Sequence, residues 1–299
     1  MKVLVFGSFN IDHVYAMPHL PARGETLYCA GYEVHVGGKG LNQALALQKA
    51  GAQTVAAGKV GPDGAYLTDY LKAGGVDVSA VAVSDVPTGH TIIECDPDGQ
   101  NQMILFGGAN RAITEADCDA VLAAHGDAAL LLTEYETSCV EPMLRKAKAS
   151  GIRTAFNPSP FVEALRDFPY ELVDCIVLNQ SEGESITGER DPEAAARALH
   201  ARNHGEVILT LGADGALYYD GTELVRAPAF RVNAVDTTGA GDTFTGYCLH
   251  ALLCGADPRD ALRIGQAAAA IEVTRPGAAE TIPDRPQVEA FLQAQGNAI

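Results

Sequence analysis

The ten residues VDTTGAGDTF, at positions 235–244, carry the clearest structural signal in this 299-residue chain. Apolar side chains continue from this stretch with the spacing of one helix face, at Phe244, Tyr247, Cys248, Ala251 and Leu252. Gly255 then predicts the end of the helix. Residues Gly239, Ala240 and Gly241 therefore lie at a helix start, where backbone N–H groups are free and no large side chain shields them. Together with the positive end of the helix dipole, these amides favour a bound anion.

Asp242 follows these small residues in the first turn of the predicted helix. A carboxylate there is unexpected if anion binding is the only task. It suits a reaction in which the carboxylate takes a proton from an attacking hydroxyl while the amides hold phosphoryl charge. The alternative is that Asp242 only stabilises the helix dipole, and the segment alone leaves both interpretations open.

Outward from this segment, short apolar runs alternate with helical patterns, which predicts an α/β fold. The strand candidates are residues 2–6, 54–57, 129–133, 154–156, 175–178 and 207–211. Most of them lead into a helix-period segment, so we expect a mostly parallel central sheet with helices on both faces. Ligands bind beyond the carboxyl ends of the strands in such sheets, and functional residues are therefore expected directly after strands.

Residues 10–36 and 88–106 interrupt this alternation. The second segment predicts two strands, 89–95 and 102–106, joined by the turn Asp96-Pro97-Asp98-Gly99. We expect the two segments to form a small antiparallel sheet inserted as a lid. Residues 1–9, 37–87 and 107–299 would then form the α/β nucleotide-binding and catalytic domain.

Four further motifs follow predicted strands: GSFNID at 7–12, GGKGLNQA at 37–44, NQSE at 179–182 and TLGADG at 210–215. Asn10 and Asp12 would share one side of an extended chain and suit recognition of hydroxyl groups, or they stabilise a turn. Lys39 and Asn42 open a helix after a glycine-rich turn, and a surface position is the alternative for both. Asn179 and Glu182 would place an amide and a carboxylate near phosphate and Mg²⁺, and the turn at 212–215 leaves room for a nucleotide.

The composition excludes several classes of function. A formal net charge of −17 argues against nucleic acid and anionic membranes as partners. We expect no membrane span, because no stretch approaches 18 apolar residues. The seven cysteines show no C-x-x-C spacing, and the N-terminus reads as a strand rather than a signal peptide, which together predict reduced thiols and a cytoplasmic protein. No G-x-G-x-x-G follows the first strand, so an NAD-dependent oxidoreductase is excluded.

Taken in order, these motifs resemble those of the ribokinase family of carbohydrate kinases, also called the PfkB family, from Gly7 to about Pro283. The two glycine-rich signatures, 37–44 and 236–242, are specific as a spaced pair. The resemblance implies an ATP-dependent kinase with Asp242 as the base and Gly239, Ala240 and Gly241 as the anion hole. The sugar contacts that it implies are Asn10, Asp12, Gly38, Lys39, Asn42, Asp242 and Glu136, with Glu134 open as an alternative to Glu136.

The resemblance also implies the remaining ligand contacts. The nucleotide residues are Asn179, Thr210, Gly212, Gly215, Gly241 and Gln266, and Glu182 would organise Mg²⁺. A monovalent cation, with K⁺ expected, would lie near Asp236, Thr238, Glu272, Arg275, Gly277 and Thr281. Members of this subgroup commonly form homodimers through the lid.

The motifs at 7–13 and 37–44 are closest to the forms found in the family's ribose kinases, so the expected reaction is D-ribose plus ATP giving D-ribose 5-phosphate plus ADP. One alternative keeps the chemistry and changes the acceptor to fructose, a nucleoside or a sugar acid. Another is a regulator that binds sugar or nucleotide without turnover, against which the intact Gly-Ala-Gly-Asp sequence speaks.

Overall fold

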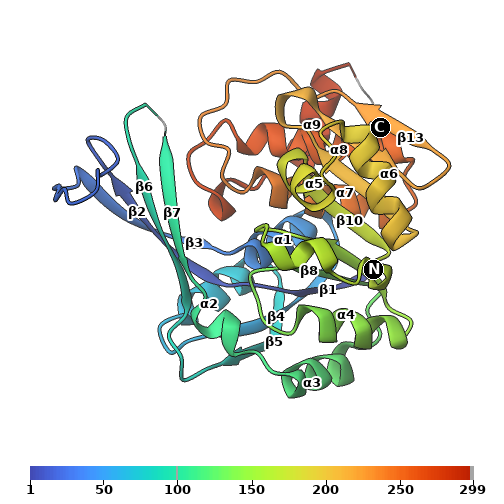
Figure 1. The fold of residues 1–299 in the computed structure, drawn as a ribbon, viewed down its shortest axis with the longest axis horizontal. Coiled ribbons are helices and arrows are strands. Elements are labelled where there is room, and N and C mark those ends of the chain that lie inside the picture. Colours follow the sequence, from blue (N-terminus) through green and yellow to red (C-terminus); the bar gives the residue numbers. More distant parts are fainter. Residues whose placement is uncertain (99, 297–299) are drawn as a thin grey trace.

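The computed structural model describes residues 1–98 and 100–296. Within these residues the main sheet has nine strands in the order β13-β12-β11-β10-β9-β8-β1-β4-β5 (Figure 1). Their bounds are β1 (Lys2–Phe6), β4 (Gln53–Val60), β5 (Asp77–Val83), β8 (Leu130–Glu134), β9 (Arg153–Asn157), β10 (Cys175–Asn179), β11 (Glu206–Thr210), β12 (Ala216–Tyr219) and β13 (Leu224–Ala227). The strands from β5 to β11 pair in parallel, whereas β12 and β13 pair antiparallel.

Alternating side chains of the strands belong to two hydrophobic cores, one on each face of the sheet. Val3 and Val5 of β1 belong to one core, and Leu4 and Phe6 belong to the other. The first core packs against α1 (Lys39–Ala50), α2 (Ala65–Ala73), α7 (Ala240–Leu253), α8 (Pro258–Glu272) and α9 (Arg285–Ala294). The second packs against α3 (Glu115–His125), α4 (Val140–Ala149), α5 (Gln180–Thr187) and α6 (Pro192–Asn203). The predicted α/β fold with helices on both faces is confirmed.

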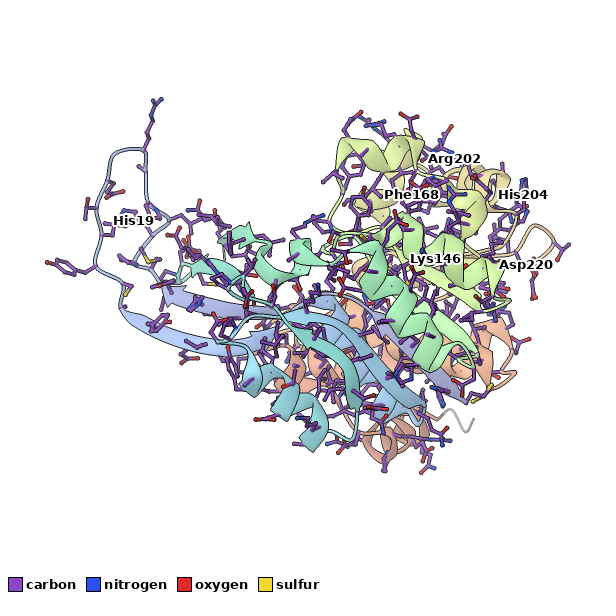
Figure 2. The ribbon with its side chains drawn as sticks, turned by 90° about the horizontal axis from the view of Figure 1, so that it is seen from below. His19, Lys146, Phe168, Arg202, His204 and Asp220 are labelled. Atoms are coloured by element: carbon purple, nitrogen blue, oxygen red, sulfur yellow. The ribbon has the colours of Figure 1, made fainter. Side chains whose placement is uncertain are left out.

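A second, smaller sheet has the strand order β3-β2-β6-β7 and projects from one end of the main domain (Figure 1). Its strands are β2 (Asn10–Ala16), β3 (Gly31–Gly37), β6 (Gly89–Cys95) and β7 (Asn101–Phe106). Gly99 of the predicted turn between β6 and β7 lies outside the described residues. Figure 2 shows His19, in the loop between β2 and β3, at the far end of this sheet.

The expectation that this sheet is antiparallel is wrong in one respect. β2 pairs antiparallel with β3, and β6 pairs antiparallel with β7, but β2 and β6 are parallel from Asn10↔Gly89 to Ala16↔Cys95. The two hairpins come from separate parts of the chain, and the first strand of each leaves the main domain in the same direction. The sheet is therefore mixed.

Short 3₁₀ segments connect several elements: η1 (Gly108–Ala112), η2 (Glu163–Asp167), η3 (Tyr170–Leu172), η4 (Gly212–Asp214) and η5 (Ala279–Thr281). Among the described residues, no helix is long and apolar enough to span a membrane.

Candidate active site

The start of α7 presents Asp242 to the end of the sheet where the parallel strands finish. Gly239 caps the helix in the left-handed region, with φ of 81°, and the helix begins at Ala240. The Asp242 side chain is buried in the first turn, at 6% exposure. Two amides from α1 hold its carboxylate: Gln43 Nε2 donates to Oδ1 at 2.8 Å, and Asn42 Nδ2 donates to Oδ2 at 3.3 Å.

The glycines of the 37–44 motif bring α1 against the end of β1. A Cβ on Gly38, whose φ is 99°, would lie 2.7 Å from the carbonyl oxygen of Ser8. A Cβ on Gly40 would lie 2.4 Å from the backbone nitrogen of Ser8. Real Cβ atoms do not approach backbone so closely, so both positions require glycine. This contact places the first turn of α1 beside Asp242.

A polar cavity of about 200 Å³ lies in front of the start of α7. The predicted site residues that line it are Lys39, Asn179, Glu182, Thr210, Gly239, Gly241 and Asp242. Residues 39, 179, 210 and 241 come from four separate elements, so the fold gathers motifs that are far apart in sequence. The cavity also includes Asn157, Ser159, Thr237 and Thr245, which the sequence analysis did not identify.

Lys39 supplies the positive charge of this cavity. Burial by itself would lower the pKa of Lys39, but the carboxylates of Asp242 and Glu136 outweigh burial and hold this pKa above its ordinary value. Lys39 is therefore a permanent cation beside Asp242, which suits an anionic ligand in an otherwise acidic protein.

Asn10 and Glu136 belong to a hydrogen-bonded cluster next to the cavity. Asn10 Nδ2 donates to Glu136 Oε2 at 3.2 Å, and the Ser8 hydroxyl donates to the same oxygen at 2.6 Å. Asn110 Nδ2 donates to Asn10 Oδ1 at 2.8 Å, which fixes the orientation of the Asn10 amide. Sequence reasoning missed Asn110, because its partners Phe9 and Asn10 are about 100 residues away.

Glu134 and Glu136 lie in different environments. Glu134 is fully buried and accepts hydrogen bonds from the backbone N–H groups of Ser8 and Glu136. Burial and the charge of Glu136 hold the pKa of Glu134 well above its usual range. Glu134 thus ties the loop after β8 to the loop after β1, whereas Oε2 of Glu136 accepts from the side chains of Ser8 and Asn10.

Asp12 lies on the small sheet, opposite His35 of β3 and Thr91 of β6. Burial raises the pKa of Asp12 to about 6, although a hydrogen bond with Thr91 acts in the opposite direction. A Cβ on Gly37 would lie 2.0 Å from Asp12 Oδ2, so the glycine makes room for the carboxylate. The charge of Glu136 contributes to the raised pKa, which links Asp12 electrostatically to the main domain.

Asn179 and Glu182 form a reciprocal capping box at the start of α5. Asn179 Oδ1 accepts from Glu182 N at 2.8 Å, and Glu182 Oε2 accepts from Asn179 N at 2.9 Å. Both residues line the cavity as well, so capping does not remove them from the site.

The other predicted nucleotide residues lie outside the cavity lining, near the β12–β13 hairpin. Gln266 Nε2 donates to the Ala227 carbonyl at 2.9 Å, and a Cβ on Gly215 would lie 2.1 Å from the same oxygen. Gly212, in η4, is exposed. The structure therefore gives Gln266 and Gly215 packing roles at this hairpin.

Most of the residues predicted to bind a monovalent cation lie in two loops, one before α7 and one after α8. Asp236 Oδ1 accepts from Thr238 N and Oγ1 at 2.9 and 2.7 Å, and Asp236 Oδ2 accepts from Gly277 N at 3.0 Å. Thr281 Oγ1 donates to the Gly277 carbonyl at 3.0 Å. The bond from Gly277 N to Asp236 joins the 235–238 and 277–281 loops. Arg275 is exposed.

Glu272 is fully buried at the end of α8, and neither carboxylate oxygen makes a well-formed hydrogen bond within the described residues. Burial raises the pKa of Glu272 to about 8, against the effect of the Thr243 hydroxyl. Unsatisfied buried oxygens fit a region that takes up a cation.

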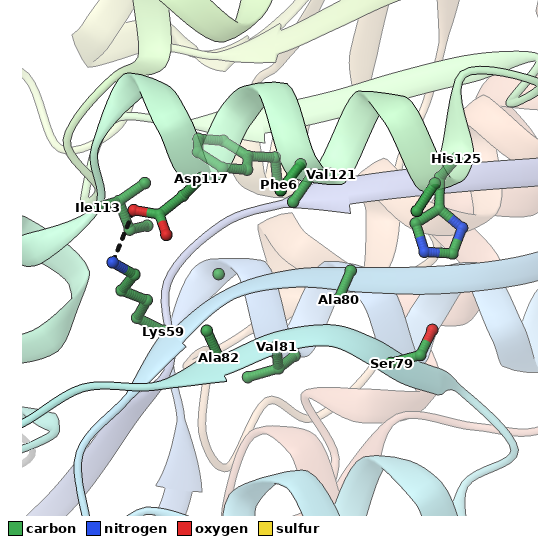
Figure 3. A pocket seen from close by; sticks show the side chains of 13 residues that line it. Phe6, Lys59, Ser79, Ala80, Val81, Ala82, Ile113, Asp117, Val121 and His125 are labelled. Atoms are coloured by element: carbon green, nitrogen blue, oxygen red, sulfur yellow. Dashed lines mark ion pairs between the residues drawn. The ribbon is translucent and has the colours of Figure 1, made fainter.

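A separate hollow of about 260 Å³ lies between α3 and the strands β4 and β5 (Figure 3). Its lining is mostly apolar, and Lys59 forms an ion pair with Asp117 over 2.6 Å at one end. None of the predicted site residues lines it.

A buried carboxylate beside a glycine-rich helix start, with a lysine in the same cavity, suits phosphoryl transfer to a hydroxyl group. A family model described as "pfkB family carbohydrate kinase" matches residues 1–285. The chain belongs to this family, and it is a phosphotransferase that acts on a sugar hydroxyl.

Three known proteins show what this chain is similar to within the family. The ribokinase of Haemophilus influenzae is 35% identical, over 97% of this chain and 97% of its own. A deoxyribokinase of Salmonella typhi is 31% identical, over 98% of this chain and 99% of its own. The structure of Arabidopsis thaliana ribokinase complexed with ribose and ATP superposes with a TM-score of 0.85 at 29% identity, covering 98% of both chains.

Proposed function

We propose that this chain transfers the γ-phosphoryl group of ATP to the primary hydroxyl of D-ribose, giving D-ribose 5-phosphate and ADP. The observation that carries the proposal is the placement of Asp242. Its carboxylate is buried at an amide-rich helix start and is bonded to α1, whose first residue, Lys39, lines the cavity with it. The resemblance to ribokinases, one of them complexed with ribose and ATP, supports ribose as the acceptor.

In this proposal the sugar binds between the small sheet and the start of α1. Its hydroxyl groups form hydrogen bonds with the side chains of Asn10, Asp12, Asn42 and Glu136. The backbone of Gly38 lies beside these side chains. Of the two glutamates after β8, we assign the sugar contact to Glu136, because both oxygens of Glu134 are committed to backbone amides. The small sheet serves as a lid that excludes water, which would otherwise compete as a nucleophile.

Asp242 takes the proton from the attacking hydroxyl as the bond to phosphorus forms. The backbone amides of Gly239 and Gly241 and the Lys39 ammonium stabilise the negative charge that develops on the phosphoryl oxygens, whereas the Ala240 amide donates to the Thr237 carbonyl at 3.3 Å. Asn179, Thr210 and the turn at 212–215 hold the nucleotide, with Gln266 supporting that turn. Glu182 lines the cavity and suits Mg²⁺, which neutralises phosphate charge when bound.

Three further properties belong to the proposal. A monovalent cation, preferably K⁺, binds at the joined 235–238 and 277–281 loops. The protein forms a homodimer through the small sheet, since every residue of β7 is exposed, including Met103 at 52% and Ile104 at 59%. Its seven unpaired cysteines suit the reducing cytoplasm.

The role of Asp242 is tested by Asp242→Asn, which keeps the shape of the side chain and removes the base. We expect kcat for ribose-dependent ADP release to fall by about 10²–10⁴ while the KM values change little. Circular dichroism should match that of the wild type, which checks that the variant is folded. A variant with near-normal turnover would remove Asp242 from the mechanism.

A further inference from the structure

Gln43 is the centre of a hydrogen-bond chain that ties the Asp242 carboxylate to the main sheet. Its side chain is fully buried in the second turn of α1. Its Nε2 donates to Asp242 Oδ1 at 2.8 Å and to Asn157 Oδ1 at 3.2 Å. Asn157, the last residue of β9, donates from Nδ2 to the backbone carbonyl of Val177 in β10 at 2.8 Å. The chain therefore runs from α7 through α1 to two central strands.

The partners determine how both amides are turned. The Val177 carbonyl can only accept, so Asn157 must present its NH₂ group to it and its oxygen to Gln43. Gln43 then faces two acceptors, the Asn157 oxygen and the Asp242 carboxylate, and only its NH₂ group can bond to both. It keeps this orientation although its own Oε1 has no partner within the described residues.

Close packing of α1 against α7 brings Gln43 within reach of Asp242. A Cβ on Gly246 would lie 2.5 Å from the Cβ of Ala46 and 2.8 Å from the backbone nitrogen of Leu47. Gly246 lies one turn after Asp242, and Ala46 lies about one turn after Gln43. The two helices therefore approach closely about one turn from the Gln43–Asp242 bond, and glycine at 246 permits that approach.

We propose that Gln43 and Asn157 are positioning residues that fix the rotation of the Asp242 carboxylate. This rests on the proposed function, in which Asp242 is the base. Among the described residues, Gln43 occupies Oδ1 with a short bond, whereas the bond to Oδ2 is the longer one from Asn42. Oδ2 is therefore the oxygen that accepts the hydroxyl proton, and Gln43 keeps it aimed at the acceptor.

The main test is Gln43→Met, which keeps the length of the side chain and removes both donated bonds. We expect kcat to fall by about 10–100-fold with KM for ribose and for ATP within about threefold, because a misaimed base slows the chemical step without weakening binding. Asn157→Leu frees the Gln43 amide to rotate, so kcat should fall in the same direction by a smaller factor.

A double-mutant cycle separates positioning from general damage to the structure. In an Asp242→Asn background the base is gone, so adding Gln43→Met should change the residual rate by less than about twofold. If the losses of kcat caused by the two single substitutions multiply in the double mutant, the proposal is overturned. A Gln43→Met enzyme with kcat within about twofold of the wild type would overturn it as well.

Asn203 provides a matched control at the end of α6. It is buried at 5% exposure, its Nδ2 donates to the Glu206 carbonyl at 3.1 Å, and its Oδ1 has no partner within the described residues. Asn203→Leu should lower the thermal midpoint about as much as Gln43→Met and leave kcat unchanged. If the wild type shows no ribose-dependent ADP release, the proposed function falls. If Asp242→Asn retains that release, the base role of Asp242 and this inference both fall. If Asp242→Asn lowers kcat and Gln43→Met does not, only this inference falls.

Discussion

At the scale of single residues, the site depends on carboxylates whose surroundings differ. Asp242 is held by two amides, Glu134 by two backbone N–H groups, and Glu136 by a hydroxyl and an amide. Glu134 therefore holds two loops together, and Glu136 and Asp242 are left to meet ligands. The sequence placed Glu134 and Glu136 after the same strand but could not distinguish them, because the difference lies in which backbone each one contacts.

Asp12 gives the site a pH dependence that can be measured through stability. Its pKa rises from 3.8 unfolded to about 6 folded, so the native state holds a proton that the unfolded state releases between these values. The Asp12 contribution therefore lowers stability as pH rises through this window. Asp12→Asn should show no gain near pH 4 and a gain over the wild type of up to about 3 kcal/mol above pH 6.

Urea unfolding of both proteins at pH 4 and pH 7.5 measures this difference. If Asp12→Asn changes the free energy of unfolding by the same amount at both pH values, the raised pKa of Asp12 is contradicted. The same variant should raise KM for ribose at pH 7.5, because the ionised carboxylate that accepts sugar hydroxyls is lost.

At the scale of elements, the first turn of α7 leaves open space next to Gly241. A Cβ placed on Gly241 meets no atom within 4 Å, and Gly241 lines the cavity. Gly241→Ala should therefore stabilise the fold by about 0.5–1 kcal/mol, since alanine favours the helix. It should nevertheless lower kcat/KM at least about tenfold, because the methyl group fills space that the phosphoryl group needs.

Thermal unfolding and steady-state kinetics of Gly241→Ala give these two readouts separately. A more stable enzyme with unchanged kinetics would show that the phosphoryl group does not approach this turn.

Most elements were predictable where burial leaves a strong pattern. The strands at 2–6 and 89–95 agree residue for residue with β1 and β6, and the other predicted strands differ at their ends by up to three residues. β5, β12 and β13 were missed. β12 and β13 have only four residues each and follow β11 without an α-helix between them, so they lack the alternation that revealed the other strands.

The glycine-rich motifs could be recognised in the sequence because close backbone contacts require glycine, as at Gly38 and Gly40. Gln43 lies in the same motif, but its partner Asp242 is 199 residues away. Its role depends on the distance between α1 and α7, which no local pattern encodes. The same holds for Asn157 and Asn110, whose partners come from other elements.

At the scale of the whole molecule, the small sheet exposes apolar side chains on one of its faces. Tyr32 and Val34 of β3 and Ile104 and Phe106 of β7 are 51%, 46%, 59% and 46% exposed. The strand register places all four on one face, opposite to the face that carries Asp12. Exposed apolar patches of this kind mark association sites, which favours a dimer built on the outer face of the lid.

Ile104→Arg should therefore shift the protein from dimer to monomer, raising the dimer dissociation constant by at least about tenfold. Val83→Arg is the matched control, since Val83 is 73% exposed on β5 at the edge of the main sheet. Sedimentation velocity over a concentration series measures both. A dimer that survives Ile104→Arg and dissociates with Val83→Arg would place the interface on the main sheet.

The central claim is that this carbohydrate kinase phosphorylates ribose. Coupled ADP release with Mg-ATP and K⁺ tests it most directly, with ribose, 2-deoxyribose, fructose, adenosine, pseudouridine and 2-keto-3-deoxygluconate compared side by side. The account predicts the highest kcat/KM for ribose, with ribose 5-phosphate as the product. A higher value for 2-deoxyribose or another acceptor would contradict the assignment of ribose and leave the mechanism standing. ADP release that no acceptor stimulates, from protein that binds ATP, would contradict the proposed reaction itself.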